Sequence, residues 1–390
     1  MLRQLERLAD DLRTVVDAVD RQLASILAEK AWSRTRSVHL VGSGDSRHAA
    51  GAATMAFHTI GGVDCRSAGT LPFLGYTPPP AGGTGEGGRP LVVAITASGA
   101  TPLVLEAVQR ARRDGCRTLA LTTTAGSPVT RAADGAVVVE LPGLERSPGV
   151  RTFQANLAGL LVLAIRLGEV RGGVAPDRAA TLRRELRALA DAVEVTHGAN
   201  RTRCREVAEL VADAPAQLVL GSGPSHGTAQ FAAAKLTEGA GVFAAAQDVE
   251  EWWHVERFAY PVDMPLFVVA PPGPAHRRAG EIAAAARGLG RRVVAVTPAE
   301  DVHVARHAAA VLPVWGAPRE EFSPLLYHLF AGAVAAALAA LLGRSPFQSD
   351  RPALRAGMDA YLARAHGGAE RSSAPVPRAP SGPPRPRCDG

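Results

Sequence analysis

The sequence is unusually short of lysine. Its 390 residues include 43 basic ones, yet only Lys30 and Lys235 are lysines and every other basic residue is arginine. Lys235 lies in the run AAAKLTEGAG, three residues before Glu238 and otherwise among small or apolar residues. Residues three apart share one face of a helix. The apolar flanks indicate that this face is at least partly buried, so a lysine there needs an explanation.

Several other features are also lacking. No apolar stretch reaches the roughly 18 uninterrupted residues of a membrane span, and the nearest, at 331–343, is better explained as a buried helix. The amino terminus has an amphipathic pattern of mixed charge and does not resemble a signal peptide. The four cysteines fit neither zinc-site spacing nor a disulfide framework. We therefore expect a cytoplasmic protein with no membrane attachment.

Nucleic-acid binding is not expected, although the net charge of +6 favours anionic partners. The sequence contains no helix-turn-helix, zinc finger or basic stripe with interleaved aromatic residues. It also contains no Walker loop and no HExxH motif, and we expect neither a metal nor a cofactor. The tail 367–390 is rich in Pro, Ser and Arg, which predicts disorder. The insertion 76–90 is predicted to be a flexible surface loop.

The chain does contain an internal repeat. Two segments, SVHLVGSGDSRHAAGAATMAF (37–57) and AQLVLGSGPSHGTAQFAAAKL (216–236), each combine an apolar strand, Gly-Ser-Gly-x-Ser and a small-residue helix. Continuous Val/Ile/Leu strands then alternate with helices, which is typical of a parallel sheet covered on both faces. We predict an α/β protein of two doubly wound, three-layer αβα domains. The predicted divisions are an N-terminal helix at 1–30, a first domain at 31–195, a second domain at 196–366 and the tail, with a helix ending near 194 between the domains.

A hydroxyl-rich turn in the first half is a candidate phosphate site. Thr96, Ser98 and Thr101 follow a strand and precede a helix that begins with Pro102. Hydroxyls and free backbone N–H groups at a helix start suit a phosphate, although the same residues can simply cap the helix. The corresponding turn of the second half, 270–275, has no hydroxyl and contains three prolines, which lack a backbone donor. We therefore expect one ligand per chain.

Two other motifs fit less well. Gly42 and Gly44 lack the third glycine of a dinucleotide-binding fingerprint. Gly223-Pro224-Ser225-His226-Gly227 matches the G-x-S-x-G elbow of α/β-hydrolases. The repeat places Ser225 opposite Ser46, however, so duplication explains this match better than hydrolase chemistry does.

With these turns identified, the chain resembles the double SIS (sugar isomerase) domain proteins, in particular the isomerase half of glutamine–fructose-6-phosphate aminotransferase and its deaminase and deglycase relatives. The resemblance covers about residues 30 to 355. Its motifs are the two phosphate loops VGSGDSRHAA and ITASGATPLVLEAV, the closing segment ERSPGVRTFQANLAGLLVLA, the catalytic segment KLTEGAGVFAAAQDVEEWWHVERFAY and the C-terminal helix PLLYHLFAGAVAAALAALLGRSPFQSDRP.

The resemblance implies a role for each matching residue. The residues implied to bind the phosphate are Ser46, Thr96, Ser98 and Thr101. Glu238 would move a proton between C1 and C2 of a sugar phosphate, Lys235 would stand beside it, and His254 would assist ring opening. In relatives this histidine often reaches the neighbouring subunit, so we expect a homodimer with Trp252, Trp253 and Phe258 near the contact. The simpler alternatives are a lysine stem that covers an apolar helix and a satisfied core histidine.

The sequence also departs from the family pattern. Asp45 replaces a usual threonine, and Gly149 stands near a position that is often serine. Together with Ser43 these are the candidate sugar contacts, although Asp45 could also cap the helix. The C-terminal lysine of the family is missing, with Gly357 near its place, and no glutaminase domain precedes the repeat. We therefore expect an aldose–ketose isomerase or an amino-sugar-phosphate deaminase or deglycase that works through an enediol or enediolamine, the alternative being a non-catalytic sensor or partner protein that binds a sugar phosphate.

Overall fold

The computed structural model describes residues 1–28, 30–78 and 88–357. The predicted disordered tail and most of the predicted loop at 76–90 lie outside these residues. The chain divides into two units, residues 1–350 and 351–390, and the description below concerns the first.

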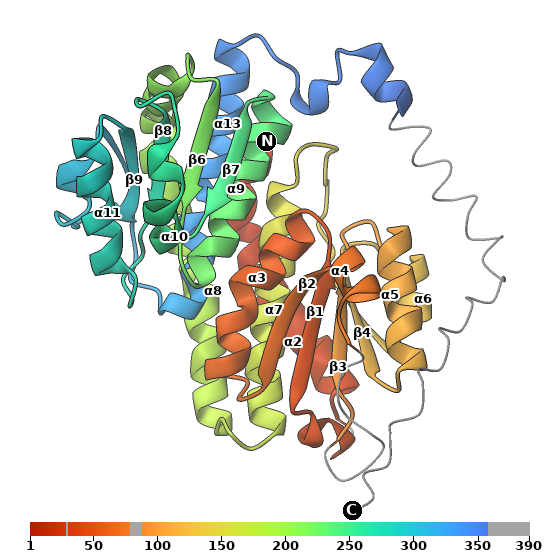
Figure 1. Ribbon diagram of the computed structural model, residues 1–390. Helices are drawn as coiled ribbons and strands as arrows, with labels where there is room; N and C mark the ends of the chain where they lie inside the picture. The colour runs from red at the N-terminus through yellow and green to blue at the C-terminus, as the bar shows by residue number, and fades with distance from the viewer. Residues whose placement is uncertain (29, 79–87, 358–390) are drawn as a thin grey trace, which may run out of the picture. The chain divides into compact units, whose positions relative to one another are not determined.

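Two five-stranded sheets, both entirely parallel, form the framework (Figure 1). The first has the order β2-β1-β3-β4-β5. The second, read from its other edge, has the order β7-β6-β8-β9-β10, which is the same arrangement strand for strand. The α/β prediction is confirmed. The strands of the first sheet are β1 (Ser37–Gly42), β2 (Asp64–Gly69), β3 (Leu91–Ile95), β4 (Arg117–Thr122) and β5 (Gly135–Val138). Those of the second are β6 (Ala216–Leu220), β7 (Phe243–Gln247), β8 (Pro265–Val269), β9 (Arg292–Pro298) and β10 (Ala310–Val314).

The central strands are buried on both faces, which explains their nearly continuous apolar sequences. All five residues of β3 are fully buried, and those of β8 are nearly so. A strand covered on both faces cannot alternate apolar and polar residues. The flanking α-helices are α1 (Leu2–Leu5), α2 (Leu8–Ile26), α3 (Asp45–Thr59), α4 (Thr70–Gly75), α5 (Pro102–Arg113), α6 (Pro128–Ala132), α7 (Val150–Val170), α8 (Pro176–Val211), α9 (Pro224–Ala240), α10 (Val249–His254), α11 (His276–Gly288), α12 (Pro324–Tyr327) and α13 (Leu329–Leu341). The 3₁₀ turns are η1 (Lys30–Arg34), η2 (Glu256–Phe258), η3 (Ala305–His307), η4 (Glu320–Phe322) and η5 (Pro346–Gln348).

The largest hydrophobic core lies among helices that belong to both halves of the chain. Helix α3 packs against α7 and α9, α2 packs against α7 and α8, and α13 packs against α8 and α9. Two helical segments, Val150–Val170 and Glu320–Leu341, are long and apolar enough to cross a membrane, but 83% and 78% of them are buried inside the protein. Burial within the protein explains their composition, as it does for core helices of other proteins.

Helix α8 is longer than the sequence predicts. Its 36 residues continue without a break to Val211, whereas the expected helix ended near residue 194. Its face toward the protein carries apolar residues along the whole length, from Leu182 to Val207, which explains why the helix does not stop earlier. The helix therefore passes through the predicted division at 195/196, and that division remains a prediction.

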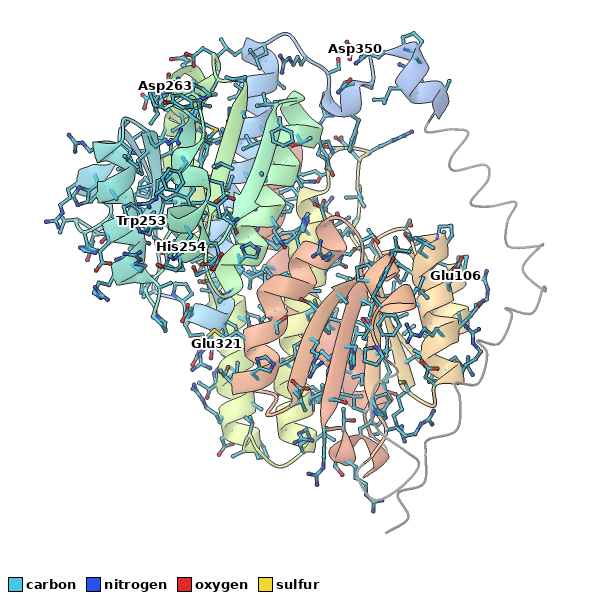
Figure 2. The ribbon with its side chains drawn as sticks, in the orientation of Figure 1. Glu106, Trp253, His254, Asp263, Glu321 and Asp350 are labelled. Atoms are coloured by element: carbon cyan, nitrogen blue, oxygen red, sulfur yellow. The ribbon has the colours of Figure 1, made fainter. Side chains whose placement is uncertain are left out.

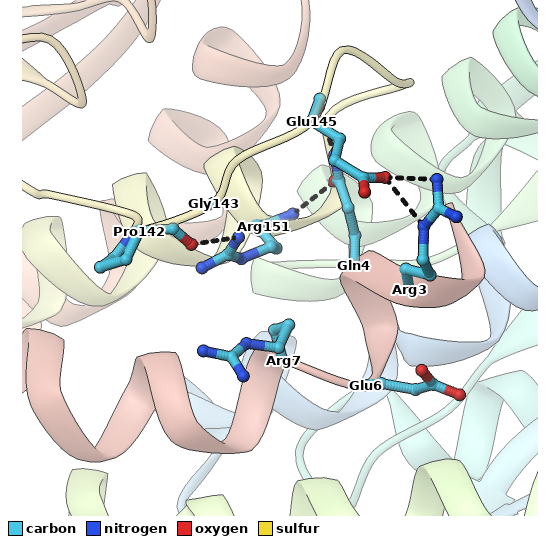
Figure 3. Close-up of a pocket in the computed structure, with 8 residues that line it drawn as sticks. All are labelled: Arg3, Gln4, Glu6, Arg7, Pro142, Gly143, Glu145 and Arg151. Atoms are coloured by element: carbon cyan, nitrogen blue, oxygen red, sulfur yellow. Dashed lines mark hydrogen bonds and ion pairs between the residues drawn. The ribbon is translucent and has the colours of Figure 1, made fainter.

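The amino-terminal helix fixes the start of α7 (Figure 3). Oε1 of Gln4 accepts hydrogen bonds from the backbone N–H groups of Val150 and Arg151 at 3.0 and 3.2 Å, and Nε2 donates to the carbonyl of Glu145 at 3.0 Å. Because the residue before α7 is Gly149, which has no side chain to cap the helix, Gln4 supplies that acceptor. The buried guanidinium of Arg151 forms two hydrogen bonds with Asp11, at 2.6 and 2.8 Å. These contacts fix the position of the first turn of α7.

Candidate functional site

The predicted phosphate turn lies at the carboxyl end of β3 and forms one wall of a cavity of about 260 Å³. Oγ1 of Thr96 lies 2.9 Å from Oγ1 of Thr101 and 3.4 Å from Oγ of Ser98. Ser46, from the first turn of α3, completes the predicted set in the same cavity. The structure therefore brings together all four residues that the sequence assigned to a phosphate, in a position where α/β folds commonly bind ligands.

The turn has a conformation that only glycine fits at one position. Gly99 has φ +65°, and a Cβ there would lie 2.0 Å from Oγ of Ser127. A further support comes from the three consecutive threonines 122–124, whose hydroxyls all donate to the carbonyl of Ala97, at 2.9 to 3.1 Å. No role was predicted for this threonine run. The available signal was its place at the end of β4, a buried strand that neighbours β3.

Helix α7 adds two cavity residues that the sequence analysis did not name, Thr152 and Asn156. Nδ2 of the buried Asn156 donates to Oγ of Ser46 at 3.3 Å and so holds that hydroxyl at the cavity. The signal was available, because Asn156 lies within the quoted closing segment ERSPGVRTFQANLAGLLVLA, which resembles a segment of the SIS family.

A close crossing of two helices brings the second half of the chain to this cavity. A Cβ at Gly227 of α9 would lie 2.5 Å from the backbone nitrogen of Ala52 and 2.7 Å from the carbonyl oxygen of His48, both on α3. Glycine and alanine thus allow the backbones of α3 and α9 to touch. The first turn of α3, with Asp45, then lies against the fourth turn of α9, with Lys235.

Lys235 is fully buried and joins the two halves. Its Nζ donates to Oδ2 of Asp45 at 2.7 Å and to Oε2 of Glu238 at 2.5 Å. It also lies 5.2 Å from the centre of the Phe231 ring, and that ring stacks on Phe153 at 3.8 Å. The carboxylates are more accessible, with 19% and 35% of the side chain exposed at Asp45 and Glu238 respectively. A buried ammonium between two carboxylates differs from a surface lysine whose stem merely covers a helix.

The surroundings of Glu238 in this cluster raise the pKa of its carboxyl group above the ordinary value of a glutamate. Burial raises its pKa, the charge of Lys235 lowers it, and the charge of Asp45 raises it again, with a net upward shift. Asp45 lines the cavity, and two hydrogen bonds link it through Lys235 to Glu238, whose side chain is 35% exposed. A carboxylate with a raised pKa beside a polar cavity is a common arrangement for proton transfer.

The structure also places the three candidate sugar contacts. Ser43 and Asp45 line the cavity, and Oγ of Ser43 lies 2.9 Å from Oγ1 of Thr70. Gly149 touches Asp45, because a Cβ on the glycine would lie 3.0 Å from Oδ2 of that aspartate. The two residues that depart from the family pattern are therefore neighbours. Whether any of the three contacts a sugar remains a prediction.

His254 is not part of this cluster. It lies at the end of α10, beside the second sheet (Figure 2), with 60% of its side chain exposed. Its Nε2 lies 3.1 Å from Oε1 of Glu250, which also binds Arg278. Trp252 is fully buried, and Trp253 stacks with the guanidinium of Arg257. Within one chain, His254 is thus a surface residue, and its proposed role would need a second copy.

The corresponding turn of the second half is filled by a carboxylate of the chain itself. A Cβ at Gly273 would lie 2.6 and 2.7 Å from the two carboxylate oxygens of Glu320, and a Cβ at Gly223 would lie 3.9 Å from one of them. Burial and the nearby Glu321 raise the pKa of Glu320. Ser225 is 2% exposed within the first turn of α9, unlike the accessible serine of a hydrolase elbow. Among the described residues, no group of three or more metal-ligating side chains forms a metal site.

Two curated proteins with similar sequences are aminotransferases. The chain is 30% identical over 260 residues to glutamine–fructose-6-phosphate aminotransferase of Thermus thermophilus, a match that covers 66% of this chain and 42% of that protein. It is 33% identical over 183 residues to the aminotransferase of the same name from Mycolicibacterium smegmatis, which covers 46% of this chain and 29% of that protein. The chain therefore spans less than half the length of these relatives. No protein-family model matches it.

Solved structures share the fold. The C-terminal domain of glucosamine-fructose-6-phosphate aminotransferase from Francisella tularensis superposes with a TM-score of 0.77 at 18% identity, over 88% of this chain and 96% of that one. Tagatose-6-phosphate ketose/aldose isomerase from Escherichia coli gives 0.70 at 16% identity, over 89% and 94%. Glucosamine-6-phosphate deaminase from Thermotoga maritima gives 0.66 at 17% identity, over 90% and 97%. At these identities the likeness establishes the fold alone.

Proposed function

We infer that the chain belongs to the double SIS domain family, and on that premise we propose that it binds a sugar phosphate and catalyses proton transfer between C1 and C2. The single observation that carries the proposal is the junction of one hydroxyl-lined cavity with the Asp45–Lys235–Glu238 cluster, in which the lysine is fully buried. The similar proteins named above act on, or are named for, phosphorylated hexoses and hexosamines. The reaction class would be aldose–ketose isomerisation, or release of an amine from the same carbons.

The phosphate would bind against the hydroxyls of Thr96, Ser98 and Thr101, which now bond one another. A phosphate oxygen accepts from hydroxyls, so the ligand would replace hydrogen bonds within the turn by stronger ones to an anion. The carboxylate of Glu320 lies against Gly273, in the corresponding turn of the second half. Because that turn already holds a carboxylate of the chain, this contact supports one ligand per chain.

The proton would be carried by Glu238. In its ionised form the carboxylate takes the proton from the carbon next to the open-chain carbonyl, which leaves an enediolate and a neutral Glu238. The acid then returns the proton to the neighbouring carbon while the hydroxyl proton passes between O1 and O2 of the sugar, so that charge and atoms balance over the cycle. Lys235, held close to the carboxylate, would stabilise the negative charge that develops on the enediolate oxygens.

The test has a binding arm and a turnover arm. Thermal shift with hexose, aminohexose and glycated amino-acid phosphates should show stabilisation by at least one of them. Thr101→Val should weaken the affinity for that ligand at least tenfold, because one hydroxyl donor is lost. Thr202→Val, an exposed threonine on α8, is the matched control. For turnover, hydrogen exchange at C2 in deuterated water should stop in Glu238→Gln but continue in Glu206→Gln, an exposed carboxylate on α8. Exchange at the wild-type rate in Glu238→Gln would refute the proton-transfer role.

A second candidate is a non-catalytic protein that binds a sugar phosphate as a sensor or partner. It is favoured by His254, which is exposed, is paired with Glu250 and is not among the residues that line the cavity in one chain. Stabilisation by a phosphosugar without exchange or product, across the whole panel and at several pH values, would support this candidate over the enzyme.

We also propose that the protein is a homodimer, and that a second copy covers the surface around His254. The segment after α10 exposes four apolar side chains, at 52 to 86% of their area: Val255, Phe258, Tyr260 and Val262. Exposed apolar residues grouped in this way often mark a contact between proteins. Light scattering after gel filtration should give twice the chain mass, and Phe258→Glu should shift it towards the monomer.

A further inference from the structure

The most unusual feature of the cluster is that one buried ammonium serves two carboxylates. Nζ of Lys235 is 2.5 Å from Glu238 and 2.7 Å from Asp45, and the lysine side chain is fully buried. Glu238 therefore does not receive the whole neutralising effect of the lysine. Its charge partner is shared with a residue from the other half of the chain, 190 positions earlier.

We propose that Asp45 is a positioning residue that governs how readily Glu238 takes up a proton, by holding Lys235 and by adding its own negative charge. The inference rests on the proposed function in so far as Glu238 is the proton carrier. It differs from the expectation that Asp45 contacts the sugar.

The contacts of Asp45 favour an indirect role over a sugar contact. Its Oδ2 is occupied by Lys235. Its Oδ1 is buried and accepts no hydrogen bond from the residues that the structure describes. Nδ1 of His48 lies 3.7 Å from Oδ1. A ligand in the cavity would thus contact the side of the Asp45 carboxyl group, because the two carboxylate oxygens face Lys235 and His48.

Gly149 makes room for the aspartate. A Cβ at this position would lie 3.0 Å from Oδ2 of Asp45 and 2.5 Å from Oγ1 of Thr152. A side chain at residue 149 would therefore push against the carboxylate that holds Lys235. This contact couples the two departures from the family pattern, an aspartate on α3 and a glycine before α7.

The charged and titratable groups around Glu238 are few. On α3 they are Asp45 and His48, and on α9 itself there is Lys235. Beyond the end of α9, Arg344 donates to the carbonyls of Ala240 and Gly241. Helix α13, which packs along α9, carries no charged residue. The groups that could modulate Glu238 from neighbouring elements are Asp45, His48, Arg344, the buried His328 at the start of α13 and the amino group of Met1, whose side chain lies against Gly239.

The inferred effects have opposite signs at two positions. The charge of Asp45 raises the pKa of Glu238, and the charge of His48 lowers it. Asp45→Asn keeps the shape and the acceptor for Lys235 but removes the charge. Because a like charge raises the pKa of a carboxyl, Glu238 should titrate at lower pH in Asp45→Asn than in the wild type. His48→Gln should shift it in the opposite direction.

The experiment is a pH titration of ¹³C-carboxyl-labelled glutamate by NMR, with the Glu238 signal assigned by its loss in Glu238→Gln. Asp177→Asn is the matched control, because Asp177 is also a carboxylate in the first turn of a long helix but lies at the start of α8. We expect a lower titration midpoint in Asp45→Asn, a higher one in His48→Gln and no change in Asp177→Asn. The acid limb of kcat/KM should move by the same amount as the midpoint.

The outcomes separate this inference from the proposed function. An unchanged Glu238 midpoint in both Asp45→Asn and His48→Gln overturns the inference, even if the enzyme is active on a sugar phosphate. A shifted midpoint with no turnover of any sugar phosphate refutes the proposed function and leaves the coupling in place. If Asp45→Asn does not fold, the Glu238 midpoint is measured in His48→Gln, where it should rise, and in Asp45→Thr, where it should fall. An unchanged midpoint in both variants again overturns the inference.

Discussion

Replacing Lys235 by methionine is the most direct test of the buried cluster. Methionine has a similar length and volume, so the change removes the ammonium with little loss of packing. It leaves Asp45 and Glu238 without their shared partner. Because both carboxylate oxygens bond one nitrogen, they lie within about 5 Å of each other, and two unit charges at that distance repel by about 3 kcal/mol at an effective dielectric constant of about 20.

The expected loss of stability is about 3–5 kcal/mol at pH 8, the usual cost of breaking a buried ion pair. The loss should depend on pH, since the charge and the hydrogen bond of Lys235 both lower the pKa of Glu238, which will rise further without them. A carboxyl whose folded-state pKa exceeds the unfolded value of about 4.3 destabilises the protein above the folded-state pKa. That penalty is lost as the pH falls towards the unfolded value. The deficit at pH 5 should therefore be clearly smaller than at pH 8.

Urea unfolding followed by tryptophan fluorescence at both pH values measures the difference. The control is Glu238→Gln, which leaves one ammonium facing one carboxylate and should stay within about 1 kcal/mol of the wild type at pH 8. The reasoning is wrong if Lys235→Met costs less than about 1 kcal/mol, or if its cost is the same at pH 5 and pH 8.

Three further predictions concern other parts of the chain. Gly99→Ala should abolish stabilisation by phosphosugars in a thermal-shift assay, because the new Cβ would meet Ser127 at 2.0 Å and φ is +65°. Asp11→Asn should lower the free energy of unfolding by about 3 kcal/mol in urea titrations, since it leaves the buried Arg151 without its anion. Cys204, whose pKa is raised to about 12 by burial, should not react with a thiol reagent at pH 8 until the protein unfolds, as peptide mapping by mass spectrometry can show.

The sequence predicted the architecture because the relevant patterns are local. A run such as Leu91–Ile95 is apolar at every position, which favours a strand buried on both faces, and the structure has that strand. Hydroxyls directly after such a strand predict a polar turn at the carboxyl edge of the sheet. The grouping of Thr96, Ser98 and Thr101 follows from their spacing. Ser46 joins them because β1, the strand that precedes its helix, is the neighbour of β3.

The contacts between the two halves were not predictable in the same way. The i, i+3 spacing places Lys235 and Glu238 on one helix face, but periodicity does not say what that face meets. The partner, Asp45, is fixed by the crossing of α3 and α9, which depends on the absence of a Cβ at Gly227. The same limit applies to Glu320, whose carboxylate reaches the Gly273 turn from a part of the chain that follows the last strand.

The continuous helix α8 has a mechanical consequence. At 1.5 Å per residue its 36 residues form a rod about 54 Å long, and it packs against α2 in the first half and against β10 and α13 in the second. Swinging one sheet away from the other would bend this rod and break backbone hydrogen bonds in the middle of a helix. The helix therefore couples the two sheets, so that a hinge movement between them would be costly.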